Sequence, residues 1–420
     1  MKKADDISQS MCIMPWIGLA TDPSGGIRPC CWMEAITPEK FLGDPKDYRD
    51  SEYLKNFKQR FKDGEYPDAC WRCKHDDSKG LESKRVRENK SWEDAGGDWD
   101  KVEDSRFDMV DLRLSNVCNL GCVMCGPKSS SFIKKEVEEH RDIAPKHNAR
   151  QIRAIEDRKL DLLNPYTDKQ IDEIIDEIGP NARIYCTGGE PSLVKKTTTL
   201  LEVLLEKGYN KTVTLQFNSN FQTLNQRWFD LLKNFKGDML PSLDGVGKTA
   251  EYVRYPCDWK KVSTNLKTFI EQCGETWTVK IMPTVSIVSI FGLPELYRWW
   301  YGEVMNEIPL VKQRVLRDKH IAMRVQVNNR LVNPEFFDVR NLPPKAKQDA
   351  KREIENIIKT YGPLFQLPKE EKFLRDAIGQ IDLEPNEDFS VTIEQLNKFD
   401  KMRNMSWRES LPQLGRYTNG

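Results

Sequence analysis

The middle of the chain alternates strand-like and helix-like segments, and this alternation limits the fold more than any other feature. Residues 106–115 (RFDMVDLRLS) place Val110, Leu112 and Leu114 on one face of a strand. Helical segments separate five further strand-like segments, at residues 182–187, 212–220, 238–245, 276–288 and 321–327. Strands joined by helical crossovers predict an α/β fold with a parallel sheet and right-handed connections, either closed toward a barrel or open.

Helical signals are strong between these strands. Thr167 and Gln170 have the spacing of a capping box, and the apolar stripe after them consists of Ile171, Ile174, Ile175 and Ile178. The charged residues 134–158 predict a solvated helical insertion, and residues 343–362 predict a helix that begins with proline and ends with glycine.

Unusual loops follow the first four strands. The loop after the first strand contains three cysteines, and the next three contain TGGEPS, NSN and SLDG. The carboxyl ends of parallel strands face one way, where α/β enzymes carry their chemistry, so we expect these loops to form one site.

The three cysteines, Cys118, Cys122 and Cys125, stand at a spacing of CxxxCxxC. Zinc sites and bacterial ferredoxin runs usually use four ligands. Three thiolates on a four-iron cluster leave one iron open to a substrate or cofactor, and Gly121 and Gly126 suit a tight loop. A structural metal knuckle, or cysteines buried in the core, is the alternative interpretation.

This loop, placed after a first strand, resembles that of the radical S-adenosylmethionine (SAM) superfamily. The resemblance implies that Cys118, Cys122 and Cys125 hold a [4Fe-4S] cluster whose open iron is chelated by SAM, and that reductive cleavage of SAM yields a 5′-deoxyadenosyl radical. Met124 departs from the aromatic residue usual before the third cysteine. The resemblance also implies SAM contacts from Met124, Gly188, Gly189, Glu190, Asn218, Ser219, Asn220, Ser242, Asp244 and Arg254, with Glu190 on the SAM amine.

The N-terminal region contains a second group of cysteines. Cys12, Cys30 and Cys31 flank a predicted hairpin, and Cys70 and Cys73 form a CxxC pair. A structural zinc held by four of these thiols is one interpretation. The block also resembles the auxiliary-cluster module of twitch/SPASM radical SAM proteins, which implies a second [4Fe-4S] cluster on Cys12, Cys30, Cys70 and Cys73, with Cys31 as the alternative to Cys30.

We therefore expect a partial (β/α)6 TIM-like radical SAM barrel at residues 106–330, after a twitch/SPASM-like module at 1–83 and a linker at 84–105, with a mainly helical C-terminal extension at 331–420. The resemblance implies a peptide or protein substrate and a reducing partner such as flavodoxin or ferredoxin. A nucleotide or sugar substrate is an alternative. A non-catalytic zinc-binding or electron-transfer scaffold is an alternative of another class.

Composition and charge bear on the partners and the cellular compartment that we expect. Lys plus Arg and Asp plus Glu each number 65, so the net charge is zero and gives no electrostatic argument for nucleic acid or a membrane. The N-terminus does not have the pattern of a signal peptide, and we expect a cytoplasmic protein without membrane spans. In that reducing compartment the 11 cysteines are interpreted as metal ligands plus buried thiols, the latter being Cys186, Cys257 and Cys273.

Overall fold

The computed structural model describes residues 3–33, 40–80, 82–307, 321–323, 326–327, 334–365 and 370–418. The chain divides into two compact units. The first unit comprises Met1–Ser115, Asp161–Gln216 and Asn234–Lys236, and the second comprises Asn116–Leu160, Phe217–Lys233 and Gly237–Gly420. The domain boundaries expected from the sequence stay predictions.

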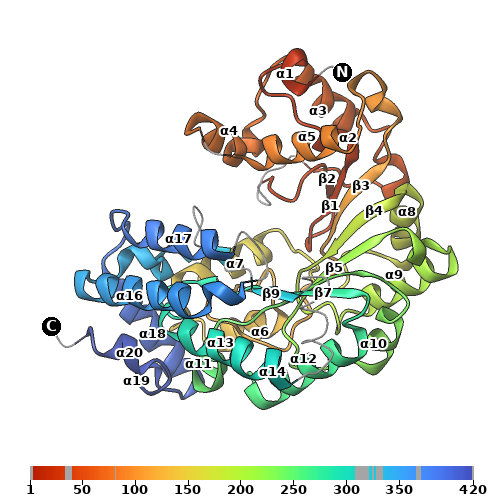
Figure 1. The fold of residues 1–420 in the computed structure, drawn as a ribbon. Helices are drawn as coiled ribbons and strands as arrows, with labels where there is room; N and C mark the ends of the chain where they lie inside the picture. Colours follow the sequence, from red (N-terminus) through yellow and green to blue (C-terminus); the bar gives the residue numbers. More distant parts are fainter. Residues whose placement is uncertain are drawn as a thin grey trace. The chain divides into compact units, whose positions relative to one another are not determined.

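The strands are β1 (Gly18–Thr21), β2 (Ile27–Arg28), β3 (Phe107–Leu112), β4 (Ile178–Cys186), β5 (Thr214–Ser219), β6 (Gly237–Pro241), β7 (Trp277–Ile281), β8 (Thr284–Val285), β9 (Ile321–Met323) and β10 (Gln326–Val327). The larger sheet has the order β2-β1-β3-β4-β5-β6-β7-β9, and Figure 1 labels its strands except β6. Strand β10 pairs with β8 separately. Among the described registers, β1 with β2 is antiparallel and the others are parallel. The expected α/β fold with a mostly parallel sheet is confirmed.

The first unit contains the helices α1 (Ala4–Ile7), α2 (Met14–Ile17), α3 (Glu52–Lys62), α4 (Trp71–Ser78), α5 (Lys84–Asp94), α8 (Asp168–Glu177) and α9 (Lys195–Glu206), with the 3₁₀ helix η3 (Trp99–Asp104). The hairpin of β1 and β2 is as predicted. Thr167 and Gln170 form the predicted capping box of α8. Residues 84–105, expected to be a linker, contain α5 and η3, and Lys84, Arg85 and Asn89 of α5 are buried.

The N-terminal part of the first unit has an apolar core of its own. Trp16 of α2 and Trp99 of η3 pack edge to face with ring centroids 6.4 Å apart, and Phe57 and Phe61 of α3 belong to the same cluster. Cys12, Cys30 and Cys70 pack against these side chains. Cysteine-bearing loops are thus attached to a packed core, which limits their freedom to move.

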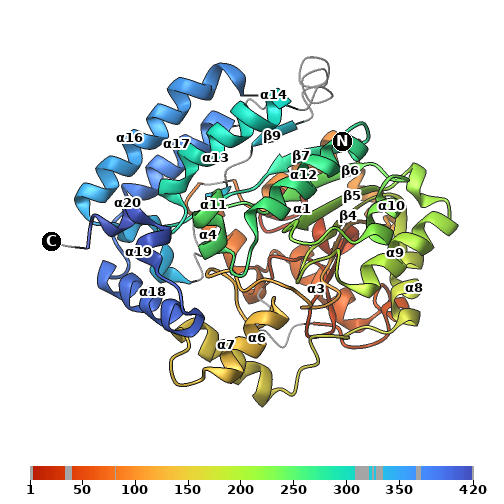
Figure 2. The ribbon, with the colours of Figure 1, turned by 90° about the horizontal axis from the view of Figure 1, so that it is seen from below.

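The second unit contains α6 (Ser131–Glu139), α7 (Lys146–Asp157), α10 (Gln226–Leu232), α11 (Gly247–Val253), α12 (Trp259–Cys273), α13 (Leu293–Arg298), α14 (Met305–Glu307), α16 (Pro344–Tyr361), α17 (Glu370–Ile381), α18 (Phe389–Arg403), α19 (Trp407–Ser410) and α20 (Pro412–Gly415). The C-terminal region is helical, as expected. Figure 2 shows α18 beside α6 and α7, and side-chain hydrogen bonds join α18 to both.

Two sequence-based expectations differ from the second unit. Residues 134–158 are helical, as expected, but they are not a fully solvated insertion, because Val137 of α6 and Ile152 and Ile155 of α7 are buried. The single strand expected over residues 276–288 is broken into β7 and β8. Pro283 lies at the break and has no N–H to donate to a neighbouring strand. Within the described residues, no helix is both long and apolar enough to cross a membrane.

Candidate functional site

The three-cysteine loop is held by backbone contacts within the second unit. Gly121 N and Val123 N donate to the carbonyl oxygens of Tyr255 and Val253, at 2.5 and 2.9 Å. Cys118 N donates to Ser131 Oγ at the start of α6, at 3.1 Å. Because these bonds use main-chain donors of the loop itself, its path does not depend on the cysteine side chains.

Two polar side chains contact the thiols of this loop. Asn220 Nδ2, after β5, lies 3.9 Å from Cys118 Sγ, and Arg254 Nη1, after α11, lies 3.7 Å from Cys122 Sγ. Burial raises the pKa of Cys122, against the lowering effect of Arg254, and burial raises the pKa of Cys125 to about 12. A metal would therefore have to displace these protons, and the nearby donors would then stabilise the thiolates.

Arg254 is itself positioned by a buried carboxylate. Its Nη2 lies 2.6 Å from Asp244 Oδ2, and Asp244 Oδ1 accepts a hydrogen bond from Thr284 N at 2.7 Å. Asp244 is fully buried, so the ion pair orients the guanidinium. Arg254 Nε is buried without an acceptor among the described residues. An anionic cluster, or the carboxylate of SAM, fits that orphaned donor and the three thiols.

The other residues predicted to contact SAM in the second unit are Met124, Asn218, Ser219 and Ser242. Met124 is half-buried in the loop. Ser219 Oγ accepts from Phe221 N at 3.2 Å, and Ser219 O accepts from Ser242 N at 2.9 Å, so both serines belong to the ends of β5 and β6. The sequence could not choose among Asn218, Ser219 and Asn220, and of these Asn220 is the one with a described contact to a cysteine sulfur.

The Gly-Gly-Glu turn follows β4 in the first unit. Gly188 and Gly189 have φ angles of 84° and 63°, the left-handed region that glycine enters without strain. A Cβ at Gly188 would lie 3.1 Å from Arg113 Cβ, so the turn also passes close to β3. Glu190 is 2% exposed, and its Oε1 accepts from Ser192 Oγ at 2.8 Å. The turn thus holds a buried carboxylate in a fixed place, which suits an acceptor for an ammonium group.

Four of the five N-terminal cysteines line one cavity of the first unit. Cys12, Cys30, Cys70 and Cys73 line it together with apolar side chains and the basic residues Arg72, Lys84 and Arg85. Burial raises the pKa of Cys12 to about 12 and also raises the pKa of Cys73. The donor set, four thiols beside basic side chains, fits a cluster of net negative charge.

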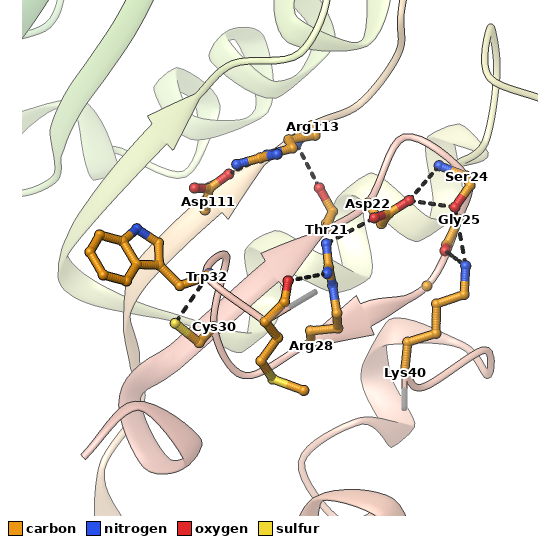
Figure 3. A network of polar contacts seen from close by, with 12 residues as sticks. Thr21, Asp22, Ser24, Gly25, Arg28, Cys30, Trp32, Lys40, Asp111 and Arg113 are labelled. Atoms are coloured by element: carbon orange, nitrogen blue, oxygen red, sulfur yellow. Dashed lines mark hydrogen bonds and ion pairs between the residues drawn. The ribbon is translucent and has the colours of Figure 1, made fainter. Parts of the chain in front are cut away.

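Cys31 is not among the residues that line this cavity. Lys84 Nζ lies 3.2 Å from its Sγ, whereas Cys30 Sγ accepts from Trp32 N at 3.4 Å. Figure 3 shows Cys30 and Trp32 near β1 and β2, with the pair of Asp111 and Arg113 on β3 and just after it. Asp111 Oδ1 and Arg113 Nε are 3.2 Å apart.

Helix α5 holds the segment that carries Cys12. Asn89 Nδ2 donates to Met11 O, and Asn89 Oδ1 accepts from Ile13 N, both at 2.8 Å. Arg85 Nη1 donates to the same carbonyl at 3.0 Å. Because these bonds satisfy main-chain groups on both sides of Cys12, its position depends on α5. Sequence reasoning missed this role, since it treated residues 84–105 as a linker.

The remaining cysteines are buried, as expected: Cys186 and Cys273 are 2% exposed and Cys257 is 9% exposed. All the cysteines are free thiols. Within the part of the chain that the structure describes, no three His, Cys, Asp or Glu side chains are arranged to hold a metal ion.

The CxxxCxxC loop of this α/β chain offers three thiols, which would leave one iron of a four-iron cluster without a protein ligand. Residues 112–289 match the sequence model of the radical SAM superfamily, and this part of the chain belongs to that superfamily. Members of the superfamily are enzymes, and membership implies a [4Fe-4S] cluster and SAM. No curated protein matches the sequence.

Several solved structures are similar at low sequence identity. Streptococcus suis SuiB bound to S-adenosylmethionine is 14% identical, with 61% of this chain and 45% of that chain covered and a TM-score of 0.32. SuiB bound to the precursor peptide SuiA is 13% identical, with 66% and 51% covered and a TM-score of 0.35. Native anSMEcpe with bound AdoMet is 10% identical, with 73% and 99% covered and a TM-score of 0.35. The chain spans about half the length of SuiB in the first two matches.

Proposed function

We propose that the chain is a radical SAM enzyme in which Cys118, Cys122 and Cys125 hold a [4Fe-4S] cluster. The cluster and SAM supply, when bound, a 5′-deoxyadenosyl radical that abstracts hydrogen from a substrate. The observation that carries the proposal is the donor arrangement at the loop, where Asn220 and Arg254 contact two of the three thiols. Hydrogen bonds to cluster sulfurs stabilise a cluster and tune its reduction potential.

In this proposal the residues that the resemblance implies bind and orient SAM. Arg254 has an orphaned Nε donor that suits a carboxylate, and Asp244 keeps its guanidinium in place. Glu190 accepts from the SAM amine, and Gly188 and Gly189 give its turn the required left-handed backbone. The proposal assigns Met124 to the adenine, Asn218 and Ser219 to the carboxylate or ribose, and Ser242 to the adenosyl group.

The cavity of the first unit is proposed to hold an auxiliary [4Fe-4S] cluster on Cys12, Cys30, Cys70 and Cys73. Two observations support this proposal: these four cysteines line one cavity, and Cys31 is not among the residues that line it. Lys84 and Arg85 place positive charge beside the thiols, which favours an anionic occupant. A zinc ion on the same four thiols is the alternative occupant.

A peptide or protein is the proposed substrate, and flavodoxin or ferredoxin the proposed reducing partner in the cytoplasm. This part rests on the resemblance of the N-terminal cysteine block to twitch/SPASM modules, which accompany peptide modification. A nucleotide or a sugar is the second candidate substrate class.

Anaerobic reconstitution tests the proposal. The protein is expected to bind about eight irons and eight sulfides per chain, and to form 5′-deoxyadenosine when SAM and dithionite are added. Cys122→Ala should abolish deoxyadenosine formation, because a loop with two thiols cannot hold the cluster. Cys273→Ala is the matched control: this buried thiol of α12 has no assigned ligand role, and its loss should leave the activity unchanged.

Deoxyadenosine formed at an undiminished rate by the Cys122→Ala protein would disprove the role of the loop. A colourless protein with one or two zinc ions and no iron would instead establish the zinc-binding scaffold.

A further inference from the structure

We infer that Arg403, the last residue of α18, is a positioning residue of the three-cysteine loop: it braces the turn at Gly121 and places positive charge beside the cluster. The inference rests on the proposed function, since it concerns the cluster on that loop. Arg403 lies 278 positions after Cys125 in the C-terminal helical region, where the sequence indicated no ligand or site residue.

The guanidinium of Arg403 is buried and its orientation is fixed. Its Nε and Nη2 donate to the two carboxylate oxygens of Glu136 on α6, at 2.7 and 2.8 Å. Arg403 is 7% exposed and Glu136 is 8% exposed. A bidentate pair of this kind fixes the plane of the guanidinium, so its remaining edge points in one direction only.

The side chain of Arg403 is in close contact with the loop and with the segment that holds the loop. Its Nη2 would lie 3.0 Å from a Cβ at Gly121, and its guanidinium carbon lies 4.9 Å from the ring centre of Tyr255. Tyr255 supplies the carbonyl that accepts from Gly121 N. The side chain of Arg403 therefore packs against the turn, while the backbone carbonyl of Tyr255 holds the turn by a hydrogen bond.

Glycine at position 121 follows from this packing. A Cβ there would meet the ring of Phe132 at 2.9 Å as well as Arg403. The side chains of Phe132 and Arg403 fill the space next to the turn, so the loop can approach them only without a side chain of its own.

One donor of Arg403 is left over. Its Nη1 is buried and has no hydrogen-bond acceptor among the described residues. A buried, unpaired donor is costly unless an acceptor or a negative charge lies nearby. A cluster ligated by thiolates supplies that negative charge. Positive charge beside a cluster favours its reduced, more negative state.

The test compares variants that differ by the charge of residue 403. Removing Arg403 alone would bury an unpaired Glu136 carboxylate and destabilise the protein. The reference is therefore Glu136→Gln, and the test protein is Glu136→Gln/Arg403→Gln, in which two amides can still hydrogen-bond. Lys401→Gln in the same Glu136→Gln background is the control, because Lys401 is an exposed cation two positions earlier on α18.

The readouts are iron content, circular dichroism, and an EPR-monitored redox titration of the cluster whose signal changes when SAM is added. We expect Arg403→Gln to lower the equilibrium constant for reduction of the cluster about tenfold. For a one-electron couple, this lowers the reduction potential by about 59 mV. Loss of iron from the loop in an otherwise folded double variant would equally support the bracing role. Glu136→Gln/Arg403→Lys, which keeps the charge, should recover the potential of the reference, and Lys401→Gln should not change it.

An unchanged potential, iron content and SAM response in the double variant would overturn the inference. A different result would disprove the proposed function: the wild-type protein would take up no iron and would not cleave SAM. In that case the inference about Arg403 would also be disproved.

Discussion

Two adjacent residues of the first unit, Cys30 and Cys31, have different surroundings. Cys30 lines the cavity with three other cysteines, and Cys31 lies beside Lys84 Nζ. We expect Cys30→Ala to lower the iron content by about four atoms per chain, because the proposed auxiliary cluster loses a ligand. Cys31→Ala should leave the iron content unchanged. Iron and sulfide analysis of the two reconstituted variants checks this.

The comparison is matched, since the same residue type is replaced at neighbouring positions. Loss of iron from the Cys31→Ala protein with normal iron in Cys30→Ala would reverse the assignment. Zinc lost from Cys30→Ala, with the iron content unchanged, would identify a zinc site instead.

Single residues also mark the limit of prediction from the sequence. The spacing of Cys118, Cys122 and Cys125 was enough to recognise the loop, because their chemistry depends on residues close together in the chain. The choice between Cys30 and Cys31 depends on which thiol faces the cavity, which spacing does not encode. Arg403 and Asn89 reach the two cysteine regions from distant helices, and nothing in their own sequence neighbourhoods signals this.

At the scale of elements, Glu103 links η3 to α3. Its carboxylate lies 2.8 Å from Lys62 Nζ and 3.2 Å from Lys58 Nζ. Partial burial acts to raise the pKa of Glu103, but the hydrogen bond from Lys62 and the charge of Lys58 outweigh it and lower the pKa to about 2. The folded state therefore binds the proton less tightly than the unfolded state, so this contribution to stability is present above about pH 4.5 and is lost as the pH falls toward 2.

Glu103→Gln should accordingly lower the free energy of unfolding at pH 7 by less than about 1 kcal/mol, because the carboxylate is largely exposed. The difference from the wild type should shrink between pH 4.5 and pH 3. Urea unfolding followed by tryptophan fluorescence measures both values. Glu52→Gln on α3 is the control, since Glu52 is more exposed and lies 3.8 Å from its lysine, and a difference that grows at low pH would contradict the assignment.

Elements also differ in how far they could be predicted. The capping box and apolar stripe of α8 are local signals, and the helix forms where they indicate. Charge in residues 134–158 suggested a solvated insertion, yet α6 and α7 each bury one face. His147 of α7 contacts the carbonyl oxygen of Cys125 at 3.2 Å. Composition alone averages over the two faces of a helix, so it cannot reveal a buried stripe on a charged segment.

At the scale of the whole molecule, the alternation of strands and helices was sufficient to predict a mostly parallel sheet, because crossover connections leave few other topologies. The division into two units was not predicted. Residues 161–216, which contain α8 and β4, belong to the first unit with the N-terminal cysteines, and residues 116–160 belong to the second. Such a division depends on long-range packing, which sequence periodicity does not report.

The division into two units predicts which segments lose stability when the N-terminal cysteine site is removed. Cys12, Cys30 and Cys70 pack against the core that contains Phe57 and Phe61 of α3. Metal binding contributes directly to the stability of the segments that supply its ligands. In the reconstituted Cys70→Ala/Cys73→Ala protein, we therefore expect amide hydrogen exchange in α3 and α5 to become about tenfold faster through local opening. Exchange in α16 of the second unit should not change, because its buried residues belong to a different compact unit.

Hydrogen exchange measured by mass spectrometry, with Cys273→Ala as the control, separates these segments. Equal acceleration in α3 and α16 would contradict local coupling of the site to the first unit, and would mean that the two units lose stability together.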